Sequence, residues 1–273
     1  MKATKKKTNI VTQINKTKKQ KRAVSSGQLF SNNHPETTVH GYGFDTPQHV
    51  KEMLSDLHNR DITYQFQVVN TMCVRAKEVF KRTKDPIKRK SIESGIKMLS
   101  VWLADYKKRD RHETESHSYM PVNMVNKLEP LAEFYNISRK ARGLEKPTTS
   151  DEGFLKVYRR IKNIAELRTM PVKAANPTGE TWDKHRNNYI FRRLSMLKNA
   201  GSEYGLYHTS GPLTGLPTVL HVNMIMWAYT PDNNLLKAEN IKNIVMHVKL
   251  VVKQYRTVDG IKSDKMNVKV KKN

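Results

Sequence analysis

Apolar residues recur at steps of three and four positions through most of residues 44–256, which is the spacing of one face of an α-helix. The strongest such stripe lies in residues 62–80, where apolar side chains share one face and basic side chains lie outside it. We therefore predict an all-α protein. Only the β-branched run at 248–252 leaves a strand open as the alternative for its segment.

Capping residues and prolines divide the first part of this pattern into separate helices. Thr46 is a suitable N-cap for a first helix, and Asp85 followed by Pro86 ends a second helix and begins a third. Three helices joined by short turns predict an antiparallel bundle. Another apolar stripe follows, in which Pro130 is expected to kink or break the helix. We assign residues 44–143 to this helical bundle module.

Residues 150–256 are expected to form a second small helical module, separated from the first by the proline-containing linker 144–149. Its best-formed helix is predicted over residues 181–200, and Gly201 is placed to end that helix in the left-handed conformation. The segment 202–216 is rich in Gly, Ser, Thr and Pro and predicts an irregular surface loop.

The net charge of the chain indicates which class of partner the protein binds. The chain has 50 Lys and Arg against 25 Asp and Glu, a formal net charge of +25, and much of the excess lies in residues 1–40 and 257–273. Segments so charged and so poor in apolar residues bury too little surface to offset their ordering entropy, so both are predicted to be disordered basic tails. Because neutralising phosphates releases counterions, the predicted partner is DNA or RNA, free or within a larger nucleoprotein assembly.

The helix predicted over residues 181–200 carries aromatic and basic side chains on a stripe beside its apolar face. Arginine forks match phosphates and guanine edges, and aromatic rings stack on unpaired bases. A short helix and a loop precede it, an order that suits a helix-turn-helix-like reader, although a solvated structural helix is the alternative. The residues predicted to contact nucleic acid in the tail and in this helix are Lys5, Lys6, Lys7, Lys18, Lys19, Lys21, Arg22, Trp182, Arg186, Tyr189, Arg192 and Arg193.

A metal-dependent nuclease centred on residues 180–221 is the alternative to non-enzymatic binding. His208 and His221 flank the glycine-rich loop, and carboxylates lie near them in the sequence. Residues 220–234 resemble the His-led helix and Pro-Asn turn of HNH homing nucleases, but the histidine and asparagine box that carries metal and catalysis in that family does not follow. A third hypothesis is a structural subunit of a virion or ribonucleoprotein particle, with basic arms that thread the genome.

The sequence lacks several targeting and cofactor motifs, and this limits the predicted location and partners. Residues 1–30 contain no apolar run of the kind a secretory signal needs, and the apolar windows at 219–229 and 244–252 are too short to span a bilayer. The single Cys73 fits a reducing compartment, and no glycine-rich nucleotide loop occurs. We therefore predict a soluble intracellular protein without a cofactor or a membrane partner, located in the cytoplasm or on the nucleoid, or in the nucleus of a eukaryotic cell.

Overall fold

A computed structural model describes residues 39–137, 153–199 and 205–270, with side chains described as far as Gln254. Within these ranges the regular elements are α- or 3-10 helices, apart from two isolated backbone bridges. The prediction of an all-α fold is therefore confirmed, and the run at 248–252 lies in a helix. The predicted tail at 1–40, with its contact residues, lies outside the described residues except for its last two positions.

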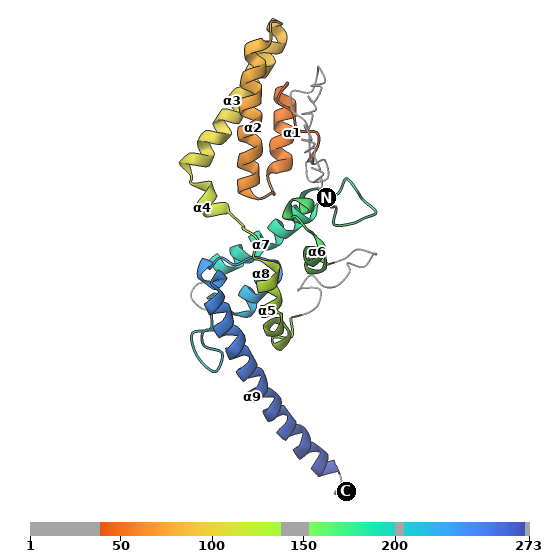
Figure 1. Ribbon diagram of the computed structural model, residues 1–273, viewed down its shortest axis with the longest axis vertical. Coiled ribbons are helices and arrows are strands. Elements are labelled where there is room, and N and C mark those ends of the chain that lie inside the picture. Colours follow the sequence, from red (N-terminus) through yellow and green to blue (C-terminus); the bar gives the residue numbers. More distant parts are fainter. Residues whose placement is uncertain (1–38, 138–152, 200–204, 271–273) are drawn as a thin grey trace, which may run out of the picture. The chain divides into compact units, whose positions relative to one another are not determined.

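Four helices form the first part of the described chain. Side chains of Thr46, Asp61 and Asp85 cap the first three, and each accepts hydrogen bonds from backbone N–H groups of the turn that follows it. Figure 1 shows the first three helices running side by side. The helices are α1 (Pro47–Leu57), α2 (Ile62–Arg82), α3 (Pro86–Lys108) and α4 (Arg111–Glu115).

Helix α3 packs closely against α1 and the segment before it. Ser91 donates a hydrogen bond to the carbonyl of Asp45, so α1 begins level with the second and third turns of α3. A Cβ on Gly95 would lie 2.9 Å from the carbonyl oxygen of Phe44 and 3.3 Å from Val50, so glycine permits this approach. The buried side chains of this first hydrophobic cluster are Val50, Met53, Leu57, Val69, Cys73 and Leu99.

The remaining elements share a second, larger hydrophobic cluster. Stacked aromatic rings lie at its centre: the ring centroid of Trp227 is 4.9 Å from that of Phe154 and 4.3 Å from that of Tyr189. The elements are α5 (Val122–Phe134), α6 (Phe154–Arg160), η2 (Ile164–Arg168), α7 (Trp182–Asn199), α8 (Val219–Met226), η4 (Asn233–Leu236) and α9 (Ala238–Val270).

Residues 122–137, which the sequence analysis grouped with the first module, contribute their apolar side chains to the second cluster. The reason is that α5 packs against α8 and α9. Helix α5 continues through Pro130, and Asn136 follows it in the left-handed conformation with φ of 53°. The linker predicted at 144–149 lies outside the described residues.

The basic segment predicted as a tail at 257–273 continues the backbone of α9 as far as Val270. Side chains of α9 are described only as far as Gln254. Among the described residues, no helix combines the length and apolar character needed to cross a membrane.

Candidate nucleic-acid interface

Two of the residues of α7 that we predicted to contact nucleic acid are buried in the protein interior. Trp182 is 3% exposed and Arg186 is 0% exposed. Both side chains are in the interior and have no surface to offer a polymer, so we correct the prediction for these two residues. Ile190 is buried beside them, as the apolar stripe had indicated.

Arg186 instead connects segments that are far apart in the sequence. Its guanidinium lies 3.6 Å from the ring centroid of Tyr119, and burial lowers its pKa. Two of its acceptors, the carbonyls of Trp227 and Ala228, follow the C-terminal end of α8, where the partial negative charge of the helix favours a cation. Arg186 donates to the carbonyls of His117 at 2.7 Å, Ser118 at 3.1 Å, Trp227 at 3.1 Å and Ala228 at 2.9 Å, and to Asn187 Oδ1 at 3.0 Å.

The other predicted residues of α7 are more accessible, but two of them are engaged. Tyr189 is half-buried and stacks on Trp227. Arg193 is also half-buried, donates to the Tyr189 hydroxyl at 3.2 Å, and lies 4.9 Å from the centre of its ring. Arg192 is therefore the one predicted contact residue of α7 whose side chain is exposed.

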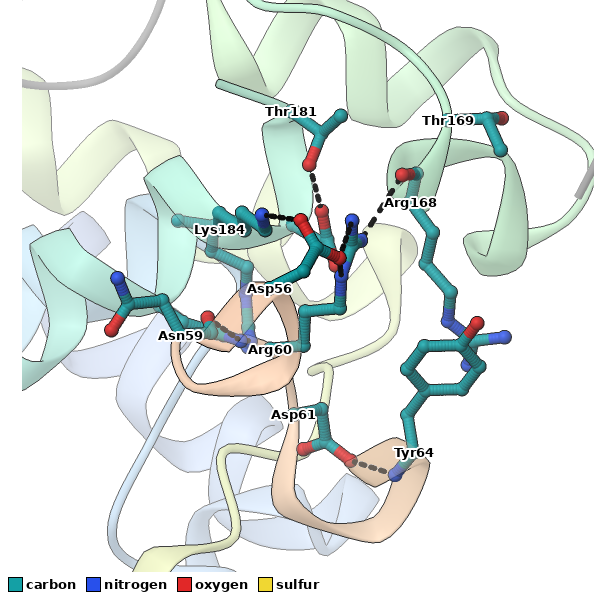
Figure 2. A network of polar contacts seen from close by, with 12 residues as sticks. Asp56, Asn59, Arg60, Asp61, Tyr64, Arg168, Thr169, Thr181 and Lys184 are labelled. Atoms are coloured by element: carbon teal, nitrogen blue, oxygen red, sulfur yellow. Dashed lines mark hydrogen bonds and ion pairs between the residues drawn. The ribbon is translucent and has the colours of Figure 1, made fainter. Parts of the chain in front are cut away.

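A buried ion pair ties the turn between α1 and α2 to α7 (Figure 2). Arg60, which is 5% exposed, donates from Nη1 to Asp183 Oδ2 at 2.8 Å and to the carbonyl of Arg168 at 3.1 Å. Its Nε and Nη2 atoms donate to Asp56 Oδ2 at 3.2 and 3.1 Å. Burial alone would lower the pKa of Arg60, but the carboxylates beside it hold that pKa above its usual value.

Further contacts complete this joint. Asp56 also accepts hydrogen bonds from Lys184 and from the hydroxyl of Tyr42. Burial raises the pKa of Asp56, yet these hydrogen bonds and the nearby cations outweigh it and leave the pKa below its usual value. The guanidinium of Arg168 lies 3.9 Å from the ring centre of Tyr64. Each of these cations already has partners within the fold, so the network is a structural joint between helices.

The histidines behind the nuclease alternative are held by the fold as well. His221 is 0% exposed, and its Nδ1 lies 3.0 Å from the carbonyl of Leu206 while Nε2 lies 2.9 Å from the hydroxyl of Thr230. Burial lowers its pKa to about 4, so the ring is neutral at pH 7 and both nitrogens are occupied. His208 Nε2 lies 3.1 Å from the hydroxyl of Tyr135. In the described part of the chain, no three His, Cys, Asp or Glu side chains are grouped to hold a metal ion.

A different basic surface lies where α2 turns into α3. We define residues 77–90 as the hairpin tip; this segment contains seven Lys and Arg residues and two acids. Because α1 begins level with residues 91–95, the tip lies beyond the start of α1. The seven basic side chains, all exposed, are Lys77, Lys81, Arg82, Lys84, Lys88, Arg89 and Lys90.

Both acids of the hairpin tip are engaged locally. Glu78 pairs with Lys81 at 2.8 Å, and Asp85 caps α3 by accepting from the backbone N–H groups of Ile87 and Lys88. Among the described residues, no ion pair of 4.0 Å or less involves the side chains of Lys77, Arg82, Lys84, Lys88 or Lys90. Within the described ranges, these five cations are therefore not neutralised by an ion pair.

The position of these charges on α3 is unfavourable for the helix itself. Lys88, Arg89 and Lys90 follow directly on the first residues of α3, which has no acidic residue in its first turn. The N-terminal end of a helix carries partial positive charge, so cations there raise the local potential and cost stability. An open concavity of about 550 Å³ lies on the same side, lined by Pro86, Ile87, Lys90, Ser91 and Ser94.

The sequence contained the signal for this tip, since seven of the residues between 77 and 90 are basic and they surround the predicted break at Asp85 and Pro86. From the sequence we interpreted that break only as the boundary between two helices. Comparison with known proteins adds no assignment, because no protein-family model and no curated protein matches the chain.

Proposed function

We propose that this is a non-enzymatic nucleic-acid-binding protein whose hairpin tip contacts phosphates. One observation supports the proposal above the others: seven exposed cations gather at the end of one helical hairpin, while its two acids are engaged locally. Unpaired basic clusters attract polyanions and gain affinity by releasing the counterions that phosphates hold. The buried arginines of the chain carry charge too, but their partners lie within the fold.

The tail and α7 enter the proposal in smaller roles. The predicted tail contacts, such as Lys5, Lys6 and Lys7, would add phosphate contacts to those of the tip. Exposed Arg192 is the one predicted contact of α7 that we retain as a full surface contact. A nucleic-acid partner, free or in a larger nucleoprotein assembly, implies a soluble intracellular protein, and no cofactor is needed for such binding.

The test measures how the binding constant for a labelled nucleic acid changes with salt. Replacing Lys84, Lys88 and Lys90 with glutamine removes three charges from the tip. Because each phosphate contact on a duplex contributes about 0.9 to the slope of log K against log salt, the slope should become less steep by about 2.7. Between about 50 and 200 mM salt this difference amounts to about 40-fold in the loss of affinity.

The matched control removes three exposed lysines that lie further along α3, Lys97, Lys107 and Lys108. In this variant the slope of log K against log salt should differ from the wild-type slope by less than about 0.45, the value for half a phosphate contact. Equal losses in both variants would refute the role of the tip, and absence of binding at low salt would refute the proposal as a whole. Adding magnesium separates the nuclease alternative, because the proposal expects the nucleic acid to remain intact.

A further inference from the structure

We propose that the hairpin tip selects double-stranded over single-stranded nucleic acid and reads phosphates rather than bases. This inference rests on the proposed function, since it names the form of nucleic acid that the same surface would bind. Charge density, the aromatic content of the tip and the chemistry of its cations support it independently.

The charges of the tip are concentrated over a short length. Residues 77–82 and 86–90 belong to two antiparallel helices that end beside each other. At a rise of about 1.5 Å per residue, each of these segments covers less than about 10 Å of helix. A duplex carries one negative charge per about 1.7 Å of its axis, roughly twice the density of one strand. A compact cluster of seven cations therefore meets more phosphates on a duplex than on a single strand.

The tip also lacks the surface on which unpaired bases would stack. Its one aromatic residue is Phe80, which is half-buried. The guanidinium of Arg89 lies 4.0 Å from the centre of the Phe80 ring and covers one face of the ring. Proteins that bind single strands obtain much of their affinity from bases stacked on aromatic side chains. With one face of its only ring covered and the residue half-buried, the tip offers little surface for stacking, so we expect no such preference for unpaired bases.

The kind of cation present favours phosphates over base edges. Five of the seven basic residues of the tip are lysines. Lysine acts as a flexible point charge, whereas bidentate recognition of guanine depends mostly on the planar fork of arginine. Of the two arginines, Arg89 is occupied by Phe80, and its guanidinium also donates to the Phe80 carbonyl at 3.4 Å. Binding at the tip is therefore expected to be largely independent of sequence.

The deciding experiment is a competition, using the full-length protein, between a labelled duplex and each of its two separated strands. With about five phosphate contacts, slopes of about 0.9 per contact for a duplex and about 0.7 for a single strand differ by about one. The ratio of duplex affinity to single-strand affinity should therefore be about tenfold larger at 0.1 M salt than at 1 M salt. A duplex of scrambled sequence should compete equally well.

Two variants assign this preference to the tip. Replacing Lys84, Lys88 and Lys90 with glutamine should remove most of the preference for duplex, while the Lys97, Lys107 and Lys108 control variant should keep it. Phe80→Leu, checked for retained helix content, should leave single-strand binding unchanged. Single strands that bind as tightly as the duplex would overturn this inference and leave the proposed function intact. Absence of binding to any of the polymers would overturn both.

Discussion

Helix α7 and the hairpin tip are both rich in basic residues, yet the fold uses them in opposite ways. On α7, Arg186 is enclosed and bonded to four carbonyls, whereas on the tip Lys84 and Lys88 are exposed. The difference follows from the number of neighbours. Helix α7 packs against η2, α8 and the turn before α2. Within the described part of the chain, the segments of α2 and α3 at the tip pack mainly against each other beyond the start of α1. A basic helix is therefore a candidate interface only where the fold leaves it uncovered.

The two regions also differ in what their charges do to stability. Arg186 and Arg60 are buried together with their acceptors, so removing either guanidinium would leave buried acceptors without a donor. At the tip, Lys88, Arg89 and Lys90 repel one another and oppose the dipole of α3. Removing one of these three charges should thus stabilise the protein slightly, whereas removing the charge of Arg186 or Arg60 should destabilise it.

Arg186→Met should have the largest effect. It removes all five hydrogen bonds of the guanidinium and leaves several buried carbonyls without that donor, so we expect a loss of about 3–5 kcal/mol in the free energy of unfolding. Urea denaturation followed by circular dichroism measures it. Arg192→Met on the exposed side of the same helix should change stability by less than about 0.5 kcal/mol. Similar losses in both variants would contradict the division of α7 into a buried and an exposed side.

Asp183→Asn should come next, because it leaves the buried guanidinium of Arg60 without one of its two carboxylates. Breaking a buried pair in this way is expected to cost about 3 kcal/mol. The matched control is Glu78→Gln, which breaks an exposed pair at the tip and should leave the urea midpoint unchanged. If the two variants unfold at the same urea concentration, the joint does not stabilise the fold as its geometry indicates.

The third prediction concerns pH. His221 is neutral in the folded state because burial lowers its pKa to about 4, whereas in the unfolded chain it takes up a proton near its ordinary pKa of 6.5. The contribution of the neutral His221 ring to the free energy of unfolding is therefore fully present above pH 6.5. It is lost as the pH drops from 6.5 toward 4, by roughly 3 kcal/mol. Urea titrations across this range should show a shallower pH dependence in His221→Gln than in the wild type. An equal dependence in both proteins would argue against a buried neutral ring.

The smallest expected effect has the opposite sign. Lys88→Gln combined with Lys90→Gln removes cations from the positive end of α3, so the protein should become more stable by about 0.5 kcal/mol. The same variant should bind nucleic acid more weakly, which separates a binding defect from a folding defect. The matched variant, Lys107→Gln with Lys108→Gln, removes favourable cations from the C-terminal end of the helix and should be slightly less stable. A variant pair that shifts stability the other way would show that the dipole argument does not apply here.

Much of the fold could be predicted because its helix boundaries depend on local chemistry. Thr46 caps α1 through its side chain, and Asp85 with Pro86 ends one helix and begins the next, as the sequence indicates. The short elements η2 and η4 were not predicted, because four or five residues give no measurable period.

The site could be predicted only in part, because burial of a polar residue depends on contacts distant in the sequence. A helical pattern places Arg186 beside the apolar face of α7, but its acceptors at 117–118 and 227–228 come from other parts of the chain. No local signal reveals that arrangement. The charge of the hairpin tip was evident from the sequence, but its exposure becomes clear only from where α1 begins.

The most direct test of the central claim is a lysine footprint on the wild-type protein. Brief acetylation with and without saturating duplex, read out residue by residue by mass spectrometry, reports which amines the nucleic acid covers. Our proposal predicts that acetylation of Lys84, Lys88 and Lys90 slows several-fold in the complex, while Lys107 and Lys108 react as before. The proposal is contradicted if the three lysines of the tip react equally fast with and without duplex while lysines elsewhere in the chain become protected.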